Sequence, residues 1–112
     1  MQSLSLTQLA LDHLDAARGA ASGRSAVTIY GGHEHQLRQT LIALTADQAL
    51  GEHESPGEAT LQVITGQVRL STSTDSWTGS TGEFLVVPPE RHDLHALTDA
   101  VVLLTVALRA SE

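Results

Sequence analysis

The periodicity of the sequence changes from helical to alternating near Gly23, and this change constrains the fold more than any other feature. Before it, apolar residues recur at roughly helical spacing over 6–20, and Ser5 with Gln8 forms an S-x-x-Q capping box. After it come short β-rich runs separated by turn signals. The expected strands are 26–30, 37–45, 49–53, 59–64, 67–71, 83–87, 92–96 and 101–108. Many short strands with no helix between them predict an antiparallel sandwich or barrel behind one helix.

Turn residues divide the β-rich part further. Thr65-Gly66 suits a tight hairpin, and the stretches 73–76 and 80–82 are polar turns. A chain of 112 residues buries one modest core, so we expect a single barrel at 25–112 preceded by a helix and flexible link at 1–24.

Composition excludes several function classes. A net charge of −7 argues against nucleic acid or an anionic membrane as partner, because both reward clustered basic residues. The chain has no cysteine and no lysine, which excludes thiolate metal sites, Schiff-base chemistry and phosphate loops of the Walker type. Neither a basic leader followed by an apolar run nor a segment of membrane-spanning length is present, so a cytoplasmic location is the default expectation.

Two segments share a spacing pattern that resembles the paired motifs of the cupin family. The first runs from His53 to Gly66, and the second contains Gly82, Pro88 and His92. In the second, the Pro-to-His stretch is one residue shorter than usual. The resemblance covers roughly 26–108, and it implies an all-β, antiparallel cupin-type double-stranded β-helix (jelly-roll) barrel with the N-terminal α-helix added in front. Such proteins include metal-dependent dioxygenases, isomerases and decarboxylases as well as members that only bind ligands.

The first motif departs from the family pattern at two of its ligand positions. Counting back from Gly66 puts the family's glutamate at Ala59 and its second histidine at Ser55. The resemblance places Ala59 and Leu61 on the inner wall of the barrel, since alternate residues of a strand share one face. The expected ligand pocket is therefore lined by His53, His92, Ala59 and Leu61. Two neutral imidazoles alone make a weak metal site.

A second His-x-His motif offers further ligands. His33 and His35 project from one face if this stretch is extended, and with His53 and His92 they would form an imidazole sphere suited to Zn, Fe, Ni or Cu. The alternative is a solvated loop that follows Gly31-Gly32. Glu54 and Glu58 are one residue out of phase with the inward positions, so we expect both to face solvent.

Some other residues have simpler interpretations. Phe84, Leu85, Val86 and Val87 are expected to be core-strand residues. Arg91, Asp93 and His95 should point away from His92. Trp77 lies in a polar, turn-rich stretch, where it either packs over a barrel end or stacks on a ligand.

Three functions follow. The first is a small cupin-like protein that binds a small molecule, with a weakly held divalent metal as an option. The second is a metal-dependent enzyme of the oxygenase or isomerase class, with His33 or His35 completing the site. The third is a degenerate cupin that serves as an interaction scaffold.

We also expect a homodimer, because a small sheet leaves edges that must be covered. The 25–30 run either extends a neighbouring subunit's sheet, aided by Leu6, Leu9 and Leu14, or closes its own.

Overall fold

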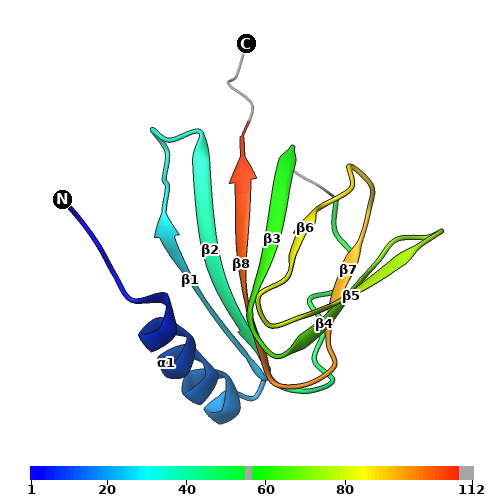
Figure 1. The fold of residues 1–112 in the computed structure, drawn as a ribbon, viewed down its shortest axis with the longest axis horizontal. Helices are drawn as coiled ribbons and strands as arrows, with labels where there is room; N and C mark the ends of the chain where they lie inside the picture. Colours follow the sequence, from blue (N-terminus) through cyan, green and yellow to red (C-terminus); the bar gives the residue numbers. More distant parts are fainter. Residues whose placement is uncertain (55–56, 109–112) are drawn as a thin grey trace.

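The computed structural model describes residues 1–54 and 57–108, and it shows one helix and two antiparallel β-sheets (Figure 1). The elements are α1 (Leu6–Gly19), β1 (Arg24–Tyr30), β2 (Leu37–Leu44), β3 (Glu58–Thr65), β4 (Gln67–Ser71), β5 (Ser76–Ser80), β6 (Phe84–Val86), β7 (Asp93–Ala96) and β8 (Ala100–Ala107). Sheet A has the strand order β1-β2-β8-β3-β6, and sheet B has the order β5-β4-β7. The predicted all-β architecture behind one N-terminal helix is confirmed.

Two hydrophobic cores lie on the two faces of sheet A. The inner core, between the sheets, contains Ile42, Leu44 and Val102 from sheet A together with Val68 and Leu94 from sheet B. The outer core lies between sheet A and α1, and it contains Ala10, Leu14, Ala17, Leu41, Ala43, Val101 and Leu103. Because alternate residues of β2 and β8 enter different cores, the central strands of sheet A are buried on both faces where α1 covers them.

Helix α1 begins where the sequence predicts. The Ser5 hydroxyl accepts a hydrogen bond from the Gln8 backbone N–H at 3.1 Å, so Ser5 is the N-cap. The reciprocal half of the capping box is absent from the described contacts, because the Gln8 side-chain amide donates to Asp12 Oδ1 at 2.9 Å instead. The helix ends at Gly19, one residue before the predicted end.

The alternation predicted for β3 is confirmed. Ala59, Leu61 and Val63 are buried in the inner core, while Glu58 and Gln62 are exposed. Gly66, with φ 91°, joins β3 of sheet A to β4 of sheet B, so the tight turn is found, but the predicted hairpin is wrong because the two strands do not pair with each other. A Cβ at Gly66 would collide with the backbone of the turn before β8, so glycine is required there on two grounds.

Three predictions about strands are wrong. The run 49–53 makes two isolated bridges and no continuous strand: Ala49 pairs with His95, and His53 pairs with His92. The two bridges are four residues apart along 49–53 but three residues apart along 92–95. This one-residue mismatch interrupts the ladder. Ser76 and Trp77 belong to β5, where a polar turn was expected.

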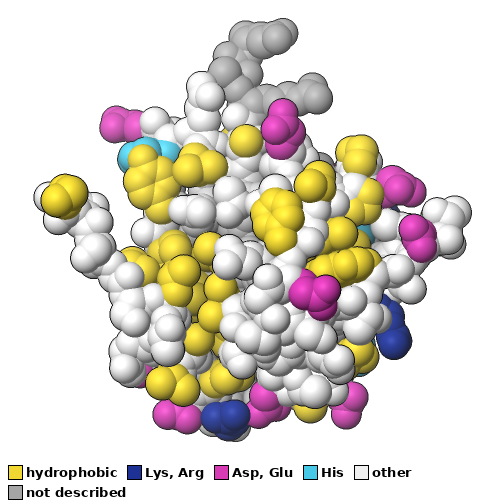
Figure 2. All heavy atoms as spheres, in the orientation of Figure 1, with side chains coloured by type: hydrophobic (Ala, Val, Ile, Leu, Met, Phe, Trp, Pro, Cys, Tyr) yellow, Lys and Arg dark blue, Asp and Glu magenta, His cyan; other side chains and the backbone are white. Residues whose placement is uncertain are grey.

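The third error concerns β6, which was expected to contribute core residues throughout. Phe84 is 59% exposed and Val86 69% exposed. The reason is that β6 is an edge strand of sheet A and contributes no residue to the outer core that α1 covers. Tyr30 and Leu37 are also exposed hydrophobic residues. Figure 2 shows apolar side chains distributed over the face of the molecule seen in this view.

Strand β1 pairs with β2 of the same chain, from Arg24–Leu44 to Tyr30–Gln39. Leu14 is buried against sheet A, and Leu6 and Leu9 pack around it. Within the described residues β1 is an edge strand that pairs on one side only, so the dimer stays a prediction, while Leu6, Leu9 and Leu14 pack α1 onto sheet A.

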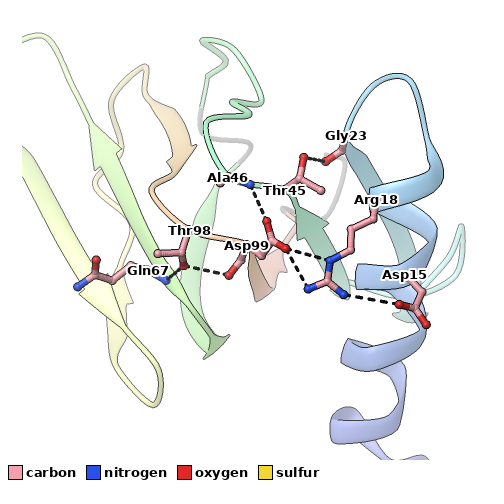
Figure 3. A network of polar contacts seen from close by, with 8 residues as sticks. All are labelled: Asp15, Arg18, Gly23, Thr45, Ala46, Gln67, Thr98 and Asp99. Atoms are coloured by element: carbon pink, nitrogen blue, oxygen red, sulfur yellow. Dashed lines mark hydrogen bonds and ion pairs between the residues drawn. The ribbon is translucent and has the colours of Figure 1, made fainter.

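A polar network joins α1 to both sheets at one end of the molecule (Figure 3). Asp99, in the turn between β7 and β8, accepts hydrogen bonds from the Ala46 N–H at 2.9 Å and from Arg18 Nε at 2.9 Å. Beside it, the Thr98 hydroxyl accepts a hydrogen bond from the Gln67 N–H at 3.0 Å.

The two ends of sheet A are thus distinct. We call the end with Leu44, Thr65 and Ala100 the network end, and the end with Leu37, Glu58 and Ala107 the far end. The strands converge at the network end and spread toward the far end (Figure 1). In the described residues, no helix is both long and apolar enough to cross a bilayer.

Candidate functional site

His53 and His92 are brought together by their backbones. The His53 N–H donates to the His92 carbonyl at 2.9 Å, and the His92 N–H donates to the His53 carbonyl at 3.0 Å. Residues paired in this way in antiparallel chains project to the same face. The ring centroids lie 4.5 Å apart with an interplanar angle of 68°, so the two imidazoles meet edge to face. The convergence predicted from the two motifs is confirmed.

The shared face of the pair is the inner one. His92 is the one buried polar or charged residue in the part of the chain that the structure describes, with 6% exposure. Leu94 and Ala96, at two and four residues beyond it, lie in the inner core, so His92 has the same phase as the inward residues of β7. His53 is half-buried, and it borders solvent more than its partner does.

Each ring has one nitrogen engaged by its own backbone. His53 Nδ1 lies 3.0 Å from the Gly51 carbonyl oxygen, and His92 Nδ1 lies 2.8 Å from the Glu90 carbonyl oxygen. A carbonyl oxygen only accepts, so Nδ1 carries the proton in both rings. In the neutral imidazoles, the lone pair is then on Nε2. This arrangement, in which the other nitrogen is held by a carbonyl, is the one found for histidines that bind metals.

Polar contacts on both sides of the pair fasten the two segments together. Asp93 Oδ1 accepts a hydrogen bond from the Gly51 N–H at 2.9 Å. Arg91 Nε lies 2.9 Å from Glu52 Oε1, and Arg91 also lies within 3.9 Å of Glu54. Arg91 and Asp93 therefore act beside the imidazoles and not between them, in agreement with their predicted direction. The ion pairs are exposed and contribute little stability, but they restrict how the segments move.

The position of the pair along the molecule follows from the backbone pairing. The segment 47–53 runs beside 92–96, from the bond between Asp47 N–H and the Ala96 carbonyl near the network end to His53 and His92. Because Glu58, five residues after His53, begins β3 at the far end, the imidazoles lie toward that end.

Ala59 and Leu61 lie where the resemblance placed them, in the inner core, with exposures of 6% and 2%. Glu58 and Glu54 are exposed, as predicted. No carboxylate replaces the one that Ala59 lacks: residues 1–54 and 57–108 contain no group of three or more His, Cys, Asp or Glu placed to hold a metal ion. Ser55, the other departure from the motif, lies outside the described residues.

His33 and His35 are exposed in the connection between β1 and β2. His35 contacts the Tyr30 ring edge to face, with centroids 5.1 Å apart. In the described part of the chain, neither histidine joins His53 and His92 in a group of three. The structure therefore does not place His33 or His35 as the third ligand of that pair. Both instead line a separate cavity at the far end.

Two features of the surface were missed by sequence reasoning. Arg38, in β2, lines the same cavity as His33 and His35. Its phase with Ile42 and Leu44, which enter the inner core, was the available signal. A smaller cavity of about 230 Å³ lies between Trp77 of β5 and Leu85, Val86 and Pro88. Trp77 is half-buried there, so it packs at a sheet edge.

Comparison with known proteins gives similarity in structure only. No protein-family model matches the sequence, and no curated protein is significantly similar to it. An RmlC-like cupin protein from Desulfovibrio desulfuricans has a TM-score of 0.74 at 22% identity, over 96% of both chains. A cupin-2 domain containing protein from Shewanella frigidimarina has a TM-score of 0.62 at 16% identity, covering 74% of this chain and 79% of its own. KdgF from Halomonas sp. has a TM-score of 0.63 at 18% identity, covering 77% and 80%.

Proposed function

We propose that this chain, which has the cupin fold, binds a small molecule at the His53–His92 pair. The observation that carries the proposal is the orientation of the two rings. Each Nδ1 donates to a carbonyl of its own segment, which leaves two Nε2 lone pairs on imidazoles whose centroids are 4.5 Å apart. Two such acceptors favour a ligand that carries a hydrogen-bond donor or a metal ion with free coordination positions.

The donor set fits a divalent transition metal, held weakly. Neutral imidazole suits Zn, Fe, Ni or Cu, and the carbonyl partners at Nδ1 fix the ring orientation that coordination needs. Most protein zinc sites use three or four protein ligands, and His53 and His92 supply two. A bound metal would supply Lewis acidity, while these two side chains would hold it against the inner wall that Ala59 and Leu61 form.

The alternative candidate is a metal-dependent enzyme of the oxygenase or isomerase class. It is favoured by the same Nε2 atoms, because a buried imidazole with an oriented Nδ1 also serves as a general base. Its coordination sphere would have to be completed by the substrate or by water. A scaffold without a ligand is the third candidate, and it predicts that neither metal nor small molecules bind.

The test is a calorimetric titration of the untagged protein with Zn²⁺ and Ni²⁺, together with a thermal-shift screen of small molecules. The variant His92→Gln should abolish metal binding, and His53→Gln should weaken it strongly. His95→Gln is the matched control, because His95 is three residues away on β7 and has the opposite phase. We expect His95→Gln to bind as the wild type does. If the wild type binds neither metal nor any small molecule, or if all three variants lose binding equally, the proposal is wrong.

The partners follow from charge and surface. We propose a second copy of the chain as the macromolecular partner, and the cytoplasm as the location. The net charge of −7 disfavours nucleic acid and anionic membranes.

A further inference from the structure

A second cavity, of about 520 Å³, lies at the far end of sheet A, and it shares no lining residue with the imidazole pair. It is lined by Thr28, the 31–33 stretch, His35, Arg38 and Leu108. A volume of this size lies within the range of about 300–1,000 Å³ that small-molecule sites occupy. Leu108 packs against the inner core, so one wall is apolar, while the remaining walls are mostly polar.

Among the described residues that line this cavity, Arg38 is the charged one, and it is positive. Arg38 supplies a guanidinium, His33 and His35 supply N–H donors, and no acidic residue of 1–54 or 57–108 lines the cavity. Glu34, between the two histidines, does not line it. The chain as a whole is acidic, with a net charge of −7, so a cavity with a positive charge and ring N–H donors differs from the average surface of this protein.

Arg38 is also uncommitted within the described residues. The ion pairs found there involve Arg18 and Arg91, and no hydrogen bond to the Arg38 side chain is present in residues 1–54 and 57–108. Arg38 pairs across the sheet with Val106, an inner-core residue, so its side chain starts from the inner face at the edge of that core. A guanidinium presents a rigid fork of donors that matches a carboxylate or a phosphate.

The glycines of the loop shape one wall of the cavity. Gly31 has φ 121°, and a Cβ there would lie 2.8 Å from the Leu37 carbonyl oxygen and 3.0 Å from Arg38 Cα. Only glycine lets the loop backbone approach the start of β2 this closely. The loop that carries His33 and His35 is thereby held next to Arg38.

We propose that this cavity binds a small anion that carries a carboxylate or phosphate group. The Arg38 fork holds the anionic oxygens, the ring N–H groups of His33 and His35 add donors, and Leu108 contacts the apolar part of the molecule. The site is additional to the one at His53 and His92, and it stands or falls independently of it.

The test is a calorimetric titration of the full chain, at low ionic strength, with two probes: inorganic phosphate and succinate. Binding of one probe and not the other identifies the preferred anionic group. Arg38→Ala should weaken the binding by about tenfold or more, since it removes a charge-assisted pair of hydrogen bonds. Arg38→Lys should bind less tightly than the wild type, because it keeps the charge and loses the fork.

Arg69→Ala is the matched control. Arg69 is exposed in β4, has no ion pair in the described residues, and lies outside the cavity, so its removal changes the net charge equally. It should leave binding unchanged. The double variant His33→Gln/His35→Gln, in an exposed loop, gives a second measurement if Arg38→Ala does not fold, and it should also weaken binding. The proposal is overturned if neither probe binds at millimolar concentration, if Arg69→Ala causes the same loss as Arg38→Ala, or if the Arg38 and histidine variants bind as the wild type does.

Discussion

At His53 and His92, a backbone carbonyl determines which ring nitrogen is free to bind a ligand. His53 and His92 each donate from Nδ1 to a carbonyl two residues earlier, and this contact selects the tautomer that leaves Nε2 free. The motif spacing predicts that the two rings converge, since it places them on neighbouring segments. It does not predict the tautomer, because the carbonyl contacts depend on the local path of 51–53 and 90–92.

Restoring a carboxylate at Ala59 should strengthen metal binding. Ala59 is 6% exposed and faces the inner core, so Ala59→Glu adds a charged oxygen ligand on the inner side. We expect the affinity for Zn²⁺ to rise by about tenfold or more, which corresponds to about 1.4 kcal/mol. Burial of an unpaired carboxylate should lower the melting temperature in the absence of metal. Calorimetry measures the first effect and thermal unfolding the second.

Thr60→Glu is the control for this change, because Thr60 is the next residue along β3 and points away from the inner core. It adds the same charge on the outer side. Equal Zn²⁺ affinities for the two variants would show that Ala59 is not a ligand position.

Asp99 makes stability depend on pH. The Ala46 N–H, and then the Arg18 guanidinium, lower the pKa of Asp99 below its ordinary value of 3.8. Because the folded state binds this proton less readily than the unfolded state, the stabilisation is complete above 3.8 and is lost as pH falls through the lowered pKa. At pH 7, Asp99→Asn should cost about 1 kcal/mol, since the site is partly exposed and solvent screens the ion pair.

Urea unfolding at neutral pH and at a pH below the lowered pKa measures this effect. The difference between wild type and Asp99→Asn should be present at neutral pH and should vanish in acid. Asp15→Asn is the control, because Asp15 lies 3.6 Å from Arg18 with its side chain 84% exposed. A loss for Asp15→Asn as large as that for Asp99→Asn would contradict the assignment.

At the scale of elements, the sequence predicts a helix or strand correctly where one face of the element is buried and the other faces solvent. Ala59, Leu61 and Val63 alternate with polar residues, and β3 lies where that alternation predicts. Strand β5 was missed because Trp77 is its one large apolar residue. The exposure of Phe84 and Val86 could not be predicted, since hydrophobicity does not tell an edge strand from a central one.

Gly79 is needed because of Trp77, which is two residues earlier on β5. A Cβ at Gly79 would overlap the Trp77 indole ring. Gly79→Ala should therefore push the indole away from the strand and toward water, and it should lower stability by about 1–3 kcal/mol through overpacking. Tryptophan fluorescence reports the movement directly, since the chain has one tryptophan. Gly19→Ala, where a Cβ would meet nothing within 4 Å and the backbone is not left-handed, controls for the loss of a glycine. Its spectrum should remain that of the wild type, and an unshifted spectrum for Gly79→Ala would refute the contact.

At the scale of the whole molecule, we expect a homodimer in solution. Strands β1 and β6 are the two edges of sheet A, and β6 carries the exposed apolar residues Phe84 and Val86, so we expect the contact surface there. Exposed apolar residues on an edge strand favour association. Light scattering should give a dimeric mass for the intact chain and a monomeric mass for Phe84→Ser/Val86→Ser. Leu11→Ser is a control on the exposed side of α1 and should remain dimeric. A monomeric wild type would end the idea.

The polar network at Asp99 implies that local opening is graded along the molecule. Arg18, Ala46 and Asp99 link α1 to the loop after β2 and to the β7–β8 turn, all at the network end. Amide hydrogens there should exchange with solvent slowly, through near-complete unfolding, whereas those of 31–36 at the far end should exchange through small fluctuations. Both candidate ligand sites lie toward the fluctuating end. A ligand can therefore slow amide exchange around its own site while the exchange rates at the network end, next to α1, stay unchanged.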